Sequence, residues 1–136
     1  MIKTLTHTSH CDILYVEVRC IGTEHMEGIM EERIKRIYSP MTETGFYILF
    51  CLQEEMHGYN IGKAVREMTG GEIVISPGTM YGSLSKMEKD GLIQFVREEE
   101  KRKSYRITEL GKEVLEQEKR RIARLYQNSK GEIYYG

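Results

Sequence analysis

Several residue types are scarce in this 136-residue chain, and each scarcity narrows the possible functions. Tryptophan is absent, proline occurs twice, and the three cysteines, Cys11, Cys20 and Cys51, form no C-x-x-C pair. An odd number of scattered cysteines disfavours a disulfide framework or a closed zinc knuckle and favours a reducing cytoplasm. No uncharged apolar run approaches about 18 residues, so we expect no membrane-spanning helix.

Catalytic motifs are missing as well. The sequence contains no recognisable nucleophile–base pairing and no glycine-rich phosphate loop, and a chain of this length has little room for a cleft once its core is filled. We therefore expect neither an enzyme nor a bound cofactor.

Charge of one sign is not in excess. Lys and Arg number 20, Asp and Glu number 21, and the formal net charge is −1. This balance excludes a globally basic nucleic-acid-binding protein, but it is compatible with a local basic patch.

Residues 1–29 show no sustained hydrophobic period and allow two interpretations. They are either a leader translated from a misplaced start, because the codons for Glu27-Gly28-Ile29 resemble a ribosome-binding site just before Met30, or a genuine arm with a strand at 13–18. A genuine arm would also supply candidate ligands for a metal or redox sensor: His7, His10, Cys11 and Cys20.

From residue 42 onward, hydrophobic periodicity predicts three helices. The first begins at the cap residue Thr42 and is apolar nearly all round, which is typical of a buried central helix. The second covers about 59–69 and carries one apolar stripe. Ser76-Pro77 is a strong start for the third, which ends at Gly91. The β-branched run Ile73–Ile75 predicts a short strand between the last two helices.

A hairpin and a final helix complete the pattern. Residues 92–97 and 103–108 read as strands joined by the charged run 98–102. Because no Asn-Gly pair is present, we expect a connecting loop longer than two residues. Thr108 caps a helix that reaches about Asn128.

This order of elements is the plan of a winged helix-turn-helix domain, in which the third helix enters the DNA major groove. Its non-core face carries small or hydroxylated residues and lysines, which let the backbone approach base edges and phosphates. These residues are Thr79, Tyr81, Gly82, Ser83, Lys86 and Lys89. Lys101-Arg102-Lys103 at the hairpin tip would reach a neighbouring backbone or minor groove.

Three blocks carry a family resemblance: Met41–Leu49, His57-Gly58-Tyr59, and Pro77-Gly78-Thr79-Met80-Tyr81-Gly82-Ser83-Leu84. Further matches lie at 86–93 and 102–108. Together they resemble the PadR family of transcriptional regulators over roughly residues 40–128. The resemblance implies a homodimeric bacterial repressor with a winged-helix domain and a C-terminal dimerisation helix. Binding of two such domains to double-stranded DNA predicts an inverted-repeat operator.

The resemblance also implies site residues. The DNA-binding set is Tyr59 on the second helix, Thr79, Tyr81, Ser83 and Lys86 on the recognition helix, and Lys101, Arg102 and Lys103 on the wing. The final helix has an apolar stripe too long for one compact head to cover, which predicts a dimer contact. That stripe comprises Leu110, Val114, Leu115, Ile122, Leu125 and Tyr126.

A small-molecule effector is compatible with the resemblance, but its identity is not encoded in a recognisable motif. Some short-tailed relatives stack flat aromatic drugs on tryptophans at the dimer interface. This chain has no tryptophan, so that stacking site is absent, and Tyr126 substitutes for it only in part.

We therefore predict a mainly α protein with a small β hairpin: an irregular arm or leader (1–29), a winged-helix DNA-binding domain (30–108), and a C-terminal dimerisation helix and tail (109–136). Two rivals remain at this stage. The acidic run Glu98-Glu99-Glu100 beside the tip favours a protein-interaction module without DNA binding. The N-terminal His/Cys cluster favours a metal or redox sensor.

Overall fold

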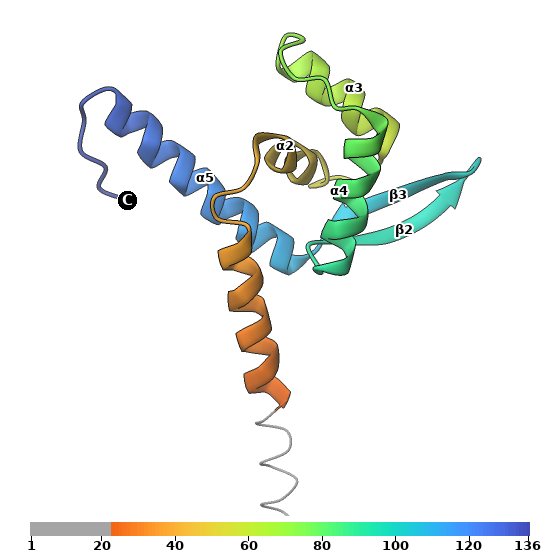
Figure 1. Cartoon of the computed structure of the whole chain (residues 1–136), viewed down its shortest axis with the longest axis horizontal. Helices are drawn as coiled ribbons and strands as arrows, with labels where there is room; N and C mark the ends of the chain where they lie inside the picture. The colour runs from red at the N-terminus through yellow and green to blue at the C-terminus, as the bar shows by residue number, and fades with distance from the viewer. Residues whose placement is uncertain (1–22) are drawn as a thin grey trace, which may run out of the picture. The chain divides into compact units, whose positions relative to one another are not determined.

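The computed structural model describes residues 23–136, and Figure 1 shows its course. Arg36–Gly136 forms one compact unit, separate from the chain before it. Its elements, in order, are α2 (Glu43–Cys51), β1 (Met56–His57), α3 (Gly58–Met68), α4 (Pro77–Lys89), β2 (Ile93–Glu99), β3 (Arg102–Ile107) and α5 (Glu109–Ser129). The predicted fold class, mainly α with a small antiparallel hairpin, is confirmed.

Residues 23–37 form a helix, so the expectation of an irregular arm is wrong for 23–29. The predicted strand at 13–18 and the cluster of His7, His10, Cys11 and Cys20 lie outside the described residues. Within 23–136 no three His, Cys, Asp or Glu side chains form a candidate metal site. In the same range, no helix combines the length and the apolarity needed to cross a bilayer.

Three helices begin where the sequence predicts. The side-chain oxygens of Thr42, Ser76 and Thr108 each accept a hydrogen bond from the backbone N–H three residues ahead, at 3.0, 3.3 and 3.1 Å. Each bond satisfies one of the free donors at a helix start, which fixes the boundary. The predicted starts of α2, α4 and α5 are therefore confirmed.

The core surrounds α2. Ile48, Leu49 and Leu52 are fully buried, and α2 contacts α3, α4 and α5. The facing helices contribute buried side chains at helical spacing: Ile61, Val65, Met80, Leu84, Met87, Val114 and Leu115. The prediction of a buried central helix is confirmed, and burial of this apolar set is the main stabilising contribution to the fold.

The sheet has the strand order β1-β3-β2 and is antiparallel. Its third strand is not the predicted Ile73–Ile75, which lies in the irregular connection before α4 with Val74 exposed. Met56 pairs instead with Tyr105 and His57 with Ser104. The prediction fails because a long-range partner strand, rather than local β propensity, decides which short segment joins the sheet.

The hairpin turn is tighter than predicted. Glu99 pairs with Arg102, which leaves Glu100 and Lys101 as a two-residue loop. Both have positive φ, 51° and 63°, as a type I′ turn requires. The expectation of a longer loop is wrong because two non-glycine residues adopt the left-handed conformation here.

The first half of α5 belongs to the core of its own chain. A Cβ added to Gly111 would overlap the carbonyl oxygen of Leu92 and lie 2.7 Å from Cγ1 of Ile107, so only glycine permits this close approach. Val114 and Leu115 are fully buried, and Leu110 is half-buried. The assignment of Val114 and Leu115 to a dimer contact is therefore wrong, because they have no surface to offer a partner.

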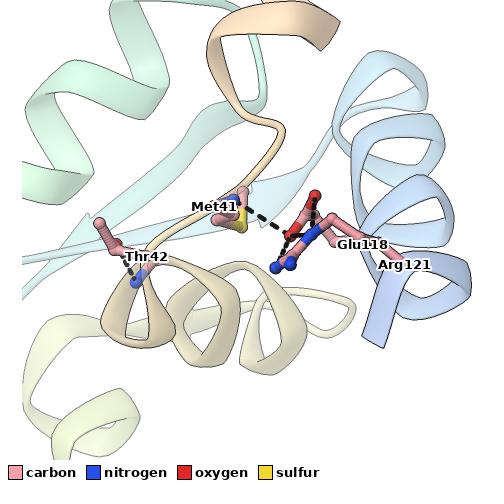
Figure 2. A network of polar contacts seen from close by, with 5 residues as sticks. Met41, Thr42, Glu118 and Arg121 are labelled. Carbon is pink, nitrogen blue, oxygen red and sulfur yellow. Dashed lines mark hydrogen bonds and ion pairs between the residues drawn. The ribbon is translucent and has the colours of Figure 1, made fainter. Parts of the chain in front are cut away.

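A buried carboxylate in the middle of α5 holds this helix against the residue that precedes the cap of α2 (Figure 2). Oε2 of Glu118 accepts a hydrogen bond from the backbone N–H of Met41 at 3.1 Å. The same oxygen forms an ion pair with Nη2 of Arg121 at 2.7 Å. Burial alone would raise the pKa of Glu118. The hydrogen bonds from Arg121 and Met41 outweigh burial and hold the pKa below its usual range.

Candidate nucleic-acid interface

Helix α4 has one face in the core and one in solvent. Met80, Leu84 and Met87 anchor it against the domain. Around them, the predicted recognition residues Thr79, Tyr81 and Lys86 are exposed and Ser83 is half-buried. The helix can therefore present a polar, sparsely covered surface to a ligand without loss of its own packing.

The wing and the helices α3 and α4 together form a basic hollow of about 210 Å³. Its lining combines five of the eight predicted DNA-binding residues, Tyr59, Tyr81, Lys101, Arg102 and Lys103, with His57, Gly58 and Tyr105. The Arg102 guanidinium lies 5.2 Å from the centre of the Tyr59 ring, a cation–π geometry that joins the wing to α3. We call this site the wing hollow.

Close backbone approach brings Tyr81 to this place. A Cβ on Gly58 would lie 3.2 Å from both Cγ of Met80 and Cε1 of Tyr81. Glycine at the start of α3 therefore lets α4 lie near enough for its tyrosine to reach the wing.

The electrostatics of the wing hollow are simpler than the sequence suggests. None of the acidic residues of the run 98–100 lines it, whereas three cations do. Glu99 lies instead 3.6 Å from Nε of Arg97. Glu98 and Glu99 remain the cross-strand partners of Lys103 and Arg102, so the acidic residues stay close to the wing cations but outside the lining of the hollow.

A carboxylate braces the base of the wing. Glu55 accepts hydrogen bonds from Oγ of Ser104 at 2.7 Å and from Nε of Arg97 at 2.8 Å. The hydrogen bond from Ser104 makes the largest contribution to lowering the pKa of Glu55, and Arg97 lowers it further. Glu55 therefore ties β2 and β3 to the segment that enters α3.

Lys86 has a structural partner that sequence analysis missed. Its Nζ lies 2.9 Å from Asp90 Oδ2 and 3.3 Å from the Tyr38 hydroxyl, which itself donates to Asp90 at 2.6 Å. Burial, followed by the bond to Asp90, raises the pKa of Tyr38 to about 12. The Lys86 side chain is still 61% exposed, so a ligand can reach it.

Two groups of residues that shape this site escaped sequence analysis: the brace Glu55–Arg97–Ser104 and the pair Tyr38–Asp90. Each joins positions more than 40 residues apart, and no local spacing signals such a contact. The predicted residues Thr79, Ser83 and Lys86 lie on α4 but do not line the wing hollow.

Comparison with known proteins agrees with this architecture. The transcriptional regulator YqjI of Escherichia coli is 30% identical over 105 residues, which cover 76% of this chain and 49% of the relative. The chain thus spans about half the length of that curated relative.

Two solved structures are similar in fold. A PadR family transcription regulator from Clostridium difficile is 32% identical with a TM-score of 0.55, over 65% of this chain and 97% of that one. A transcriptional regulator from Clostridium thermocellum is 31% identical with a TM-score of 0.56, over 65% and 86%.

The family profile for PadR-like transcriptional regulators matches residues 48–117, just over half of the chain, from within the central helix α2 to the first half of α5. Membership of a family of regulators agrees with the expectation that the chain is not an enzyme. The chain belongs to the PadR family.

Proposed function

We propose that this chain is a DNA-binding transcriptional regulator that acts as a homodimer in the bacterial cytoplasm and represses transcription from an inverted-repeat operator. The observation that carries the proposal is the wing hollow. Three tyrosines and three cations from α3, α4 and the wing line it, and no acidic residue does.

In the proposed complex, α4 lies in the major groove and its exposed face reads base edges. The free N–H groups at its start favour a phosphate, because they coincide with the positive end of the helix dipole. The wing cations contact the backbone beside the groove and fix the register of the helix.

The second half of α5 supplies the proposed dimer contact. Ile122, Leu125 and Tyr126 are 40%, 51% and 66% exposed, unlike the buried residues of the first half. Two copies joined by this stripe would place two recognition helices about one helical turn of DNA apart. A small-molecule effector that releases DNA remains part of the proposal, with its binding place unassigned.

Fluorescence anisotropy with the DNA upstream of the protein's own gene tests the proposal. We expect binding that weakens steeply with salt, and the triple variant Lys101→Ala/Arg102→Ala/Lys103→Ala should flatten the log–log salt slope by up to about 2.7, since each lost phosphate contact removes about 0.9. The affinity at moderate salt should fall at least about tenfold.

Lys112→Ala is the control, because this lysine lies on α5 in a solvent-exposed pair with Glu109. Its salt slope should match that of the unaltered chain. Failure of the unaltered chain to prefer its upstream DNA over scrambled DNA would favour the rival function, a protein-interaction module that uses the acidic edge at 98–100. An equal slope for the triple variant would remove the wing from the DNA interface.

A further inference from the structure

A second cleft adjoins the wing hollow. It has a volume of about 320 Å³ and lies between one face of α3 and the segment that leads into α4. Tyr59, Gly62, Lys63 and Arg66 line it from α3, where they repeat at helical spacing. Val74, Ile75, Pro77, Met80 and Tyr81 line the opposite side. We call it the α3 cleft.

The cations of the α3 cleft are not engaged elsewhere. Lys63 and Arg66 are exposed, lie one turn apart on the same face, and make no ion pair or side-chain hydrogen bond within the described part of the chain. No acidic residue lines the cleft. By contrast, Lys86, Arg97 and Arg121 are each held by a carboxylate. Two free positive charges over an acid-free cleft are complementary to a polyanion.

The α3 cleft is continuous with the wing hollow. Tyr59, Tyr81 and Gly58 line both, so the two tyrosines stand between the cations of α3 and the cations of the wing. The two sites therefore form one continuous stretch of positive charge with no acidic residue in its lining.

We propose that the α3 cleft binds backbone phosphates of the operator, with Lys63 and Arg66 neutralising them and continuing the line of phosphate contacts made by the wing. This inference rests on the proposed function. Each neutralised phosphate adds to a sequence-independent affinity, so cations that continue from the wing along α3 suit a nucleic-acid backbone that passes beside α4.

The apolar part of the α3 cleft suggests an alternative ligand. Met80, Val74 and Ile75 could also receive the apolar body of a small carboxylate, with Lys63 and Arg66 on its charge. The absence of a full enclosure and the continuity with the wing hollow favour the DNA backbone, and the small anion becomes an outcome of the test.

The test compares Lys63→Ala/Arg66→Ala with the unaltered chain in anisotropy titrations on the upstream DNA fragment over a salt series. We expect the salt slope to flatten by up to about 1.8 and the affinity to fall at least about fivefold, with the ratio of operator to scrambled DNA unchanged, because phosphate contacts carry no sequence information. Lys63→Arg/Arg66→Lys, which keeps both charges, should retain the slope.

Lys112→Ala/Arg120→Ala is the matched control, since it removes two exposed charges from α5. Circular dichroism melting confirms that each variant is folded. If the unaltered chain binds the fragment and the α3 variant keeps its slope, this inference is wrong while the proposed function stands. A slope that is kept, together with loss of a thermal shift induced by octanoate or benzoate, would assign the cleft to a small anion. No specific binding by the unaltered chain would overturn both.

Discussion

Glu118 shows how a single buried charge can be tolerated in a small core. Its side chain is 1% exposed, yet both of its oxygens are satisfied by Arg121 and one also by the backbone of Met41 (Figure 2). A buried carboxylate without such partners would be strongly destabilising, whereas a fully hydrogen-bonded one fixes the geometry of the elements it joins.

Glu118→Gln should therefore destabilise the protein by about 2 kcal/mol, because it removes the charge from a buried pair and turns one acceptor into a donor facing Arg121. Urea unfolding followed by circular dichroism measures the change. Glu116→Gln is the control: its pair with Lys119 is largely exposed and should be worth less than about 0.5 kcal/mol. Equal effects of the two substitutions would show that the buried pair of Glu118 and Arg121 contributes no more than an exposed pair.

The lowered pKa of Glu118 predicts that the stability of the protein depends on pH. The pKa of Glu118 lies below its usual value of about 4.5 in the folded chain, so its stabilising contribution is complete above that value and is lost as the pH falls through the lowered pKa. Between pH 5 and pH 3, the unaltered protein should lose more stability than Glu118→Gln. Parallel stability curves for the two proteins would contradict this assignment.

At the scale of elements, the wing illustrates a local conflict between sequence and conformation. Glu100 and Lys101 both have positive φ, a conformation that costs a non-glycine residue about 1 kcal/mol. The hairpin bears this cost and has a lysine rather than a glycine at its tip, where the proposed interface needs a cation.

Glu100→Asn should relieve part of that strain, since asparagine tolerates the left-handed region and favours this turn type. We expect a gain of about 0.5 kcal/mol in unfolding free energy and a rise in DNA affinity from loss of a nearby negative charge. Glu98→Gln removes a charge from a strand position instead and should raise affinity without a stability gain. A stability gain in both would mean that charge, rather than turn geometry, limits the hairpin.

Local signals explain which elements could be predicted. The caps at Thr42, Ser76 and Thr108 involve residues within four positions of each other, so the sequence contains the whole interaction. Strand β1 could not be predicted because Met56 and His57 owe their conformation to β3, almost 50 residues away. The two-residue turn was missed because its residues lack the usual Asn-Gly signature.

At the scale of the molecule, α5 has two roles along one helix. Its first half completes the core around α2, and its second half carries exposed apolar side chains. A continuous apolar stripe in the sequence does not reveal where the covering domain ends, so Val114 and Leu115 could not be told apart from Ile122 and Leu125 before the structure was known.

Leu125→Glu should convert the proposed dimer into a monomer, because it places a charge in the exposed stripe. Light scattering coupled to size exclusion measures the mass, and DNA affinity should fall at least about tenfold through loss of the second recognition helix. Arg120→Glu, on the opposite side of α5, should leave the dimer intact. An unchanged mass for Leu125→Glu would place the dimer contact on another surface.

The candidate site was predictable only where short sequence motifs mark its residues. Motif blocks located α4 and the wing, and the structure brings Tyr59, Tyr81 and residues 101–103 together. The contributions of Glu55, Tyr38 and Asp90 depend on chain segments meeting in space, which one sequence does not encode in any short pattern.

The fastening of Glu118 to Met41 has a consequence for operator choice. Because this contact holds the middle of α5 against the DNA-reading head, the second half of the helix leaves the domain at a set angle, and the proposed dimer keeps its two heads at a fixed separation. One inserted base pair turns the second half-site by about a tenth of a helical turn and moves it about 3.4 Å. A head that cannot swivel would reject such a site even when every base it reads is correct, so the spacing between half-sites would carry part of the specificity.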